Sequence, residues 1–311
     1  MKCLINQKNW WWLKIFPTYF NVVPANIYSQ CHNQYNPKEH FVFIDNGEDQ
    51  KSIDYWANHG FMVIVEKNCF EPYLDDPVIV KVENCLYLSS KIWLWIDLAL
   101  ENRHRQYHHL RSNIPADKFF LMLMNQKKSH RDQLFEITKS YHDRSLYSYV
   151  DRGYYIKDDV PPTGTPFQTG SSDQRFYNPA WYAQTAFSLV SESQVTGPRR
   201  ISEKIFKPIA FQHPFLVNST PGNLQFLREL GFETFNHIID ESYDAINNPL
   251  LRLQAIEQVL KDLYNDYKHG LLLFSDGISQ QKILHNYNKF YNVDLLFEKE
   301  IINPIKEFIN T

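Results

Sequence analysis

The sequence predicts an α/β protein built from two doubly wound domains that face a central cleft. Short runs of β-branched and aromatic residues alternate with segments of helical spacing, and the alternation starts again after a break at 112–115. A strand, a helix and a second strand within about 25 residues imply that the strands pair in parallel. A length of 311 residues also favours two domains over a single core.

The first domain is expected to cover residues 1–115. An apolar run at 41–44 ends in an Asn-Gly turn signal. Helical spacing and a second apolar run follow, and the three segments together form a βαβ unit. The expected elements are a strand at 41–44, a helix at 48–59, a strand at 61–65 and a long helix at 87–111. Pro115 closes the break after that helix and marks the domain boundary.

The second domain is expected to cover residues 116–285. Strands are expected at 118–124, 187–190 and 215–217, each followed by a helix, with further helices at 223–230 and 249–267 and a loop at 151–180. Residues 279–311 are expected to be mostly helical. The segment 286–311 could pack back on the first domain.

The composition excludes several classes of protein. A net charge of −3 gives no basic footprint, so a nucleic-acid partner is not expected. The longest apolar run, at 92–100, is interrupted by Asp97 and is too short to span a bilayer. Four cysteines without CxxC spacing indicate reduced thiols. We therefore expect a cytoplasmic protein without a transmembrane segment, with peripheral association at the inner membrane surface left open.

Charged residues gather where the strand at 187–190 gives way to the next helix. Ser202 is a good N-cap, which places Glu203 and Lys204 in the first helical turn, where backbone N–H groups and the helix dipole favour an anion. Lys204 could neutralise a diphosphate, and the Glu203 carboxylate could accept hydrogen bonds from a ribose diol. A solvated helix face is the competing interpretation.

A second donor-rich loop follows the strand at 118–124. Asn125 begins it, and Lys127, Lys128 and His130 precede Arg131, whose guanidinium could bind phosphate in a bidentate manner. Parallel strands end at the same edge of a sheet, so the two loops are expected to meet there. An ordinary basic surface loop is the alternative.

Two acidic residues follow the strand at 41–44. Asp45 or Glu48 could act as a general base that takes the proton of an acceptor hydroxyl. The alternative is an Asn-Gly turn with solvated acids at the start of a helix.

Other catalytic motifs are absent or weak. His104 and His108 have helical metal-ligand spacing, but no glutamate of a zincin motif lies between them, so no metal is expected. The sequence contains no P-loop, no GxGxxG and no GxSxG, which removes the main support for kinase, dehydrogenase and hydrolase interpretations.

The charged segment resembles the donor-binding motif of a known family. Ser191-Glu192-Ser193, Ser202-Glu203-Lys204-Ile205-Phe206 and the later His213-Pro214-Phe215 are similar to the motif of the α-1,3-fucosyltransferase-like glycosyltransferases, and exostosin-type transferases carry a similar pattern. The stretch from Pro221 to Asp244 looks like uncharacterised bacterial and viral proteins grouped with glycosyltransferases. The resemblance covers roughly residues 118–265.

The resemblance implies a GT-B-like fold of two Rossmann-like domains, the first on the acceptor side and the second binding the donor. It implies that Glu203 contacts the ribose of a nucleotide-sugar donor and that Lys204 and Arg131 contact its phosphates. Glu192 would contact the sugar or hold the loop around it.

This chain departs from the family pattern at two positions. Ser193 replaces the family's Asn, and Arg200 stands where fucosyltransferases tend to have Tyr. The donor therefore need not be GDP-fucose.

The resulting expectation is an inverting glycosyltransferase of the hexosyl or fucosyl type, with a glycan acceptor and no cofactor or bound metal. Two alternatives stay open. One is a retaining transferase in which Glu192 and Glu203 form an acidic pair. The other is a catalytically inactive protein of the same fold that binds a glycan or a nucleotide.

Overall fold

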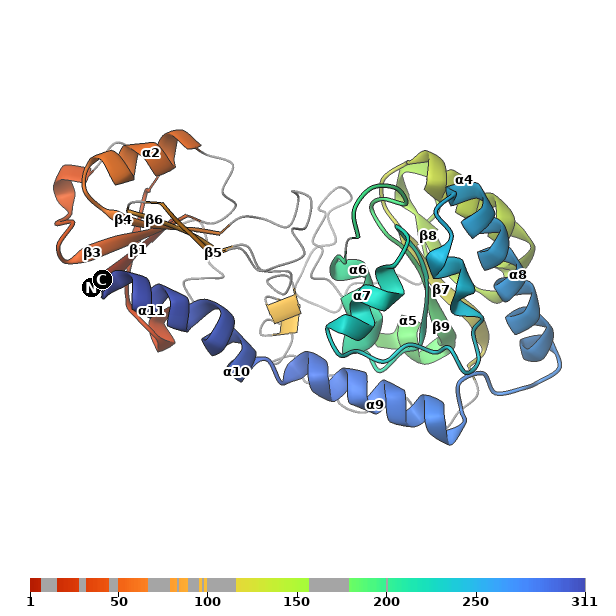
Figure 1. Cartoon of the computed structure of the whole chain (residues 1–311). Coiled ribbons are helices and arrows are strands. Elements are labelled where there is room, and N and C mark those ends of the chain that lie inside the picture. The colour runs from red at the N-terminus through yellow and green to blue at the C-terminus, as the bar shows by residue number, and fades with distance from the viewer. Residues whose placement is uncertain are drawn as a thin grey trace. The chain divides into compact units, whose positions relative to one another are not determined.

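The computed structural model describes residues 1–6, 16–27, 32–44, 50–66, 79–82, 84–88, 95–96, 98–99, 116–156, 179–199 and 201–310. The chain divides into two compact units, where unit 1 is Met1–Trp93 with Val293–Thr311 and unit 2 is Leu94–Asn292. Each unit has its own, mostly parallel sheet with helices packed on it (Figure 1). The predicted α/β class with two doubly wound sheets is confirmed.

The sheet of unit 1 has the strand order β2-β1-β3-β4-β6-β5. The strands are β1 (Lys2–Asn6), β2 (Asn21–Ala25), β3 (His40–Ile44), β4 (Met62–Glu66), β5 (Ile79–Val82) and β6 (Cys85–Leu88). All neighbours pair in parallel except β5, which runs antiparallel to β6 at the edge. The strands β2 and β3 lie on opposite sides of β1, so the strand order reverses there. Asp45 and Glu48 follow β3 but lie outside the described residues.

Residues on both faces of β3 and β4 are buried, which explains why these strands read as continuous apolar runs. On one face Leu4, Val42 and Val63 pack with Trp56 of α2 (Gln50–Asn58), and the Trp56 indole N–H donates to the Ile27 carbonyl at 2.6 Å. The last residues of the chain also belong to unit 1. They form α10 (Asp294–Phe297), the π-helix η6 (Glu298–Ile302) and α11 (Asn303–Ile309).

The sheet of unit 2 is entirely parallel, with the order β10-β9-β7-β8. Its strands are β7 (Lys118–Met124), β8 (Leu146–Tyr149), β9 (Thr185–Ser191) and β10 (Phe215–Asn218). Its helices are α4 (Ser129–Thr138), α5 (Pro179–Gln184), α6 (Glu203–Ala210), α7 (Asn223–Glu229), α8 (Pro249–Lys268) and α9 (Gly277–Tyr291), with 3-10 turns at η3 (Lys139–Arg144), η4 (Val150–Arg152) and η5 (Glu241–Ala245).

The connections of unit 2 diverge from the middle of its sheet. The helix α4 leads from β7 to β8 on one side, whereas α6 leads from β9 to β10 on the other. Right-handed crossovers in opposite directions place their helices on opposite faces, and Figure 1 shows α4 and α8 on one face with α6 and α7 on the other. The topological switch point of this sheet therefore lies between β7 and β9.

The predicted β-to-α steps are confirmed in both units, but the long helix expected at 87–111 is wrong at its start. Tyr87 and Leu88 belong to β6, which pairs with β4 on one side and β5 on the other. A short apolar run suits a strand or a helix equally, and here the strand partners decide. Of the remainder, only 95–96 and 98–99 are described, and they are helical.

The sequence reasoning also missed β1, β2, β5 and β8. Each has only four or five residues, and β2 contains Pro24, which argues against a strand unless the strand lies at an edge. The structure places both β2 and β8 at edges. No helix in the described part of the chain is long and apolar enough to cross a membrane.

Candidate functional site

The candidate site lies at the carboxyl ends of β7 and β9. Open α/β sheets bind ligands at this position when the connections on its two sides diverge, because a crevice forms between them. The loop after β7 leads into α4, and the loop after β9 leads into α6. The side chains described below come from these two loops and from the first turns of the two helices.

Glu192 is buried, with 1% of its surface exposed, and it closes the base of the loop after β9. Its carboxylate accepts hydrogen bonds from the Ser193 N–H at 3.3 Å, from the Ser202 N–H at 3.1 Å and from the Ser202 hydroxyl. One side chain thus joins both ends of the loop 193–201. Burial raises the pKa of Glu192, although the charge of Lys204 and the hydrogen bonds from Ser202 oppose the rise.

The first turn of α6 forms as the sequence predicts. Ser202 adopts an extended conformation at the N-cap, and its hydroxyl accepts from the Lys204 N–H at 3.3 Å. The Lys204 ammonium donates to the hydroxyls of Ser193 and Ser202, each at 3.3 Å, and to the Glu203 carboxylate. Lys204 keeps 23% of its side chain exposed and Glu203 keeps 10%. Both charges can therefore still meet a ligand.

Glu203 is poised as an ionised acceptor. Burial by itself would raise the pKa of its carboxyl, but the charge and hydrogen bond of Lys204, together with the charge of Lys207, outweigh burial and lower the pKa. A carboxylate in this state accepts hydrogen bonds from hydroxyl groups.

The start of α4 brings three basic side chains to the same place. The Lys128 ammonium donates to the Ser193 carbonyl at 2.9 Å, and the His130 Nε2–H donates to the Glu192 carbonyl at 3.1 Å. Arg131 is 3% exposed, and one of its Nη atoms donates to the Gln126 carbonyl at 3.0 Å. Burial lowers the pKa of both His130 and Arg131.

One N–H group of the Arg131 guanidinium makes no hydrogen bond to the described residues. Its Nε is buried and has no hydrogen-bond partner among the described residues. A buried N–H without a partner is unfavourable by about 1–3 kcal/mol, and by more for a charged group, so such atoms indicate a bound ligand or water. Arg131 also interacts electrostatically with Glu192 and Glu203, which places its charge within the cluster.

The N-terminus of α4 is also open in a way that the N-terminus of α7 is not. Lys128 occupies the N-cap of the ten-residue helix α4 and makes no side-chain cap hydrogen bond. In α7 the Asp244 carboxylate accepts from the Leu224 N–H at 3.0 Å and from the Gln225 N–H at 3.1 Å. Of these two helices, α4 is the one whose positive end is left for an anion.

The structure brings together six residues that the sequence singled out: Arg131, Glu192, Ser193, Ser202, Glu203 and Lys204. Two others lie at the margin. Asn125 and Lys127 are exposed, and both bind Asp151, through the Asn125 carbonyl at 3.1 Å and the Lys127 N–H at 2.8 Å. Arg200, Asp45 and Glu48 lie outside the described residues.

Lys128 and His130 belong to the cluster, although sequence reasoning ranked Lys127 above Lys128. A signal for Lys128 was present. The buried residues of α4 are Arg131, Leu134, Phe135 and Thr138, and Lys128 precedes Arg131 by three positions, which is helical spacing for the same face.

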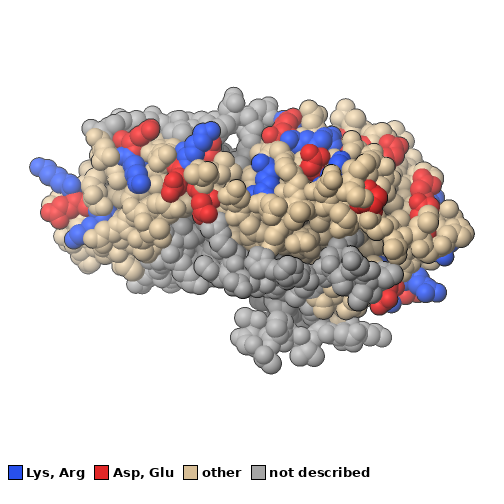
Figure 2. Space-filling model, turned by 90° about the horizontal axis from the view of Figure 1, so that it is seen from below, with Lys and Arg blue, Asp and Glu red and all other residues tan. Residues whose placement is uncertain are grey.

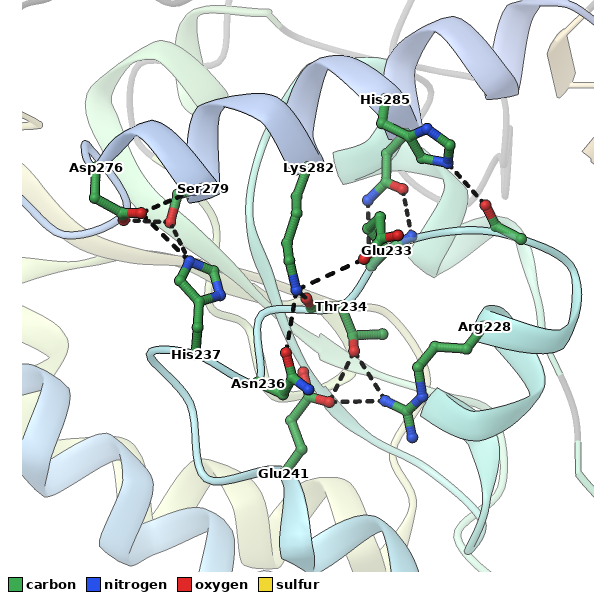
Figure 3. Close-up of polar contacts among 12 residues, drawn as sticks. Arg228, Glu233, Thr234, Asn236, His237, Glu241, Asp276, Ser279, Lys282 and His285 are labelled. Carbon is green, nitrogen blue, oxygen red and sulfur yellow. Dashed lines mark hydrogen bonds and ion pairs between the residues drawn. The ribbon is translucent and has the colours of Figure 1, made fainter.

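A serine, a histidine and an aspartate also meet in unit 2, but they do not form a catalytic triad. Figure 3 shows His237 beside Ser279 and Asp276 at the start of α9. The same Nε2 of His237 lies 2.9 Å from the Ser279 hydroxyl and 3.5 Å from Asp276, whereas a triad uses opposite ring nitrogens. Ser279 is fully buried, and its N–H donates to Asp276, the N-cap of α9. This cluster caps a helix.

Within the described ranges, no three His, Cys, Asp or Glu side chains are close enough to hold a metal ion. Figure 2 shows acidic and basic side chains interspersed over the described surface of one face, without an extended patch of either sign.

No protein-family model matches the sequence, and no curated protein matches it. The solved structures that are similar to the chain include a DNA-modifying β-glucosyltransferase, determined in the presence and absence of its substrate uridine diphosphoglucose, with 9% identity and a TM-score of 0.48 over 100% of both chains. They also include an α1,3-fucosyltransferase, with 11% identity and a TM-score of 0.46 over 94% of this chain and 90% of that one.

Both of these structures are glycosyltransferases.

Proposed function

We propose that the chain is a glycosyltransferase whose unit 2 binds a nucleoside diphosphate sugar at the carboxyl ends of β7 and β9. One observation carries this proposal. Arg131 and Lys204 come from helices on opposite faces of the sheet and meet the ionised Glu203 at the topological switch point. Two cations beside an acceptor of hydroxyl hydrogen bonds match the two parts of a nucleoside diphosphate, its phosphates and its ribose.

The same arrangement suits group transfer. An acceptor hydroxyl oxygen attacks the anomeric carbon, the bond from that carbon to the diphosphate oxygen breaks, and the acceptor proton passes to a base. Negative charge grows on the departing nucleoside diphosphate. Positive groups fixed at that point stabilise the transition state more than the ground state, and we assign this role to Lys204 and Arg131.

The finer parts of the proposal concern the other reactant. We propose that unit 1 holds a glycan hydroxyl, that Asp45 or Glu48 accepts its proton, and that transfer inverts the configuration at the anomeric carbon. A single displacement with one base gives inversion. The anomeric configuration of the product, read by NMR, tests this, because a retained configuration would require a different mechanism.

Calorimetric titration with GDP, UDP and CDP sugars, followed by transfer assays on a glycan array, tests the function. The proposal predicts binding of one nucleotide class and transfer to at least one glycan. No binding of any nucleotide would refute the donor site. Binding without transfer or hydrolysis would instead indicate a nucleotide-binding protein that lacks the reaction.

A further inference from the structure

The loop 193–201, here called the β9 loop, is held in place by residues of the candidate site and by residues outside it. Lys128 and Glu192 fix its first residue and close its base. Two further attachments come from α7 and α8, which follow it in sequence. Because the β9 loop carries Ser193 and leads into Ser202 and Lys204, its conformation decides where these groups lie.

Arg252 makes the attachment from α8. Its side chain is 1% exposed, which is unusual for an arginine. One Nη donates to the carbonyl of Val195 in the β9 loop, and the other donates to the carbonyl of Ile246 and lies 3.4 Å from that of Asn247. A single guanidinium thus joins the β9 loop to the segment before α8.

Arg199 makes the attachment to α7. Its guanidinium lies 3.0 Å from both carboxylate oxygens of Glu229, and it sits over the Phe226 ring at 5.2 Å from the centroid. Gly222, at the start of α7, leaves room for the Arg199 side chain, since a Cβ there would lie 3.2 Å from the Arg199 Cδ. The β9 loop is therefore anchored on both sides of the exposed residues 196–198.

We infer that Arg252 is a positioning residue for donor binding, which holds the β9 loop in the conformation that presents Ser193 and Lys204 to the diphosphate. The inference rests on the proposed function and adds a residue that does not touch the ligand. Burying a charge is unfavourable unless the group is hydrogen-bonded, and both Nη groups of this guanidinium donate to backbone carbonyls, whereas its buried Nε has no hydrogen-bond partner among the described residues.

Lysine cannot replace arginine in this role. The two ends of the Arg252 fork bind carbonyls of different segments at once, whereas an ammonium is a single point charge at the end of a flexible stem. The variant Arg252→Lys therefore keeps the charge but loses the bridge between the β9 loop and α8.

The test compares Arg252→Lys with Ile256→Ala, a matched variant one turn further along α8. Ile256 is also fully buried, and its aliphatic side chain cannot hydrogen-bond to the β9 loop. Binding of GDP and UDP is measured by calorimetry at a temperature at which both variants are folded. We expect Arg252→Lys to weaken binding about tenfold, the scale of one charged hydrogen bond, and Ile256→Ala to leave it within about twofold despite a lower melting temperature.

Hydrogen exchange without ligand gives a second, independent measurement. Arg252→Lys should accelerate exchange of the amides of 193–199, and Ile256→Ala should not. Equal losses of affinity in the two variants, or unchanged exchange in Arg252→Lys, would overturn the positioning role. If the wild-type protein binds no nucleotide, the proposed function fails, and the exchange measurement alone then decides whether Arg252 positions the β9 loop.

Discussion

Glu192 and Glu203 lie in one cluster, yet the pKa values of their carboxyl groups move in opposite directions. Burial raises the pKa of Glu192, whereas Lys204 and Lys207 overcome burial and lower the pKa of Glu203. Carboxylates whose environments separate them in this way have different tasks. The Glu192 carboxylate accepts hydrogen bonds from both ends of the β9 loop. This structural role disfavours the retaining mechanism, in which Glu192 would act on the sugar together with Glu203.

The raised pKa of Glu192 predicts a pH dependence of stability. The folded protein keeps a proton on this carboxyl at pH values above 4.5, its ordinary pKa, where the unfolded chain releases it. The stability that this group contributes is therefore complete below that pH and is lost as the pH rises through the folded pKa.

The variant Glu192→Gln cannot titrate, so it should lack this fall. Urea unfolding of both proteins across the interval above pH 4.5 checks the prediction: the stability of the wild type relative to the variant should decline as the pH rises. A difference that stays constant with pH would contradict it.

The two cations of the site give a second prediction at this scale. Lys204→Ala and Arg131→Ala should each weaken nucleoside diphosphate binding by about 1.5–3 kcal/mol, the range for a hydrogen bond to a charged group. The control is Lys139→Ala, because Lys139 directly follows α4 and forms an exposed ion pair with Glu136. Calorimetric affinities unchanged in both site variants would mean that the diphosphate binds elsewhere.

Much of the cluster can be predicted from sequence because it depends on local rules. Ser202 is a good N-cap, and the residues after it must lie in the first turn of a helix. The role of Glu192 could not be predicted this way, because its partner Ser202 returns to it only after a loop of nine residues. The role of Arg252 could not be predicted from the sequence either, because nothing in the neighbouring residues indicates that it binds Val195, 57 positions away.

At the scale of elements, the site depends on how two loops and three helix starts fit together. The β9 loop reaches α7 through Arg199, and the start of α7 is in turn held by Asp244, which accepts from two of its N–H groups. Gly222 sits between these attachments with φ of +73°, in the left-handed region that favours glycine. A small residue at this point thus permits the close approach of the β9 loop.

Gly222→Ala should therefore be more destabilising than its backbone conformation alone requires. The left-handed conformation costs a non-glycine residue about 1–2 kcal/mol, and the added Cβ would also displace Arg199. Gly153→Ala is the matched control, because Gly153 has φ of +77° and nothing within 4 Å of an added Cβ. Equal losses of unfolding free energy in urea would show that the Arg199 contact contributes nothing.

The strands that sequence reasoning missed show the limit of prediction for elements. β1 has only five residues but lies inside its sheet, between β2 and β3. Its pairing with those two strands makes it a strand, and such long-range partners leave no mark on the local sequence. The longer β-to-α steps were predicted because two periodicities follow one another within each step.

At the scale of the whole molecule, the chain forms two units with separate cores, and its last residues belong to unit 1. Phe297, Ile305 and Phe308 are buried in unit 1. The helix α9 belongs to unit 2, where Figure 3 shows it fastened to the segment 231–241. Lys282 donates to the Thr234 carbonyl at 2.6 Å, and Asn286 exchanges two hydrogen bonds with the Glu233 backbone.

Two cores predict two unfolding events that can be separated. Ile305→Ala should lower the transition of unit 1 by removing a fully buried side chain, a loss of about 2–5 kcal/mol. A saturating nucleoside diphosphate should raise the transition of unit 2, because a ligand stabilises the state that binds it. Scanning calorimetry checks both effects, and a single transition that responds to both changes would contradict this division of the chain.

Hydrogen exchange with and without a saturating nucleoside diphosphate tests the central claim most directly. The ligand should protect amides at 127–132 and 193–206, which line the carboxyl ends of β7 and β9, while leaving those of the polar cluster at 231–241 unchanged. Protection confined to any other segment, or no protection at a concentration that saturates binding, would show that the switch point of this sheet is not the nucleotide site.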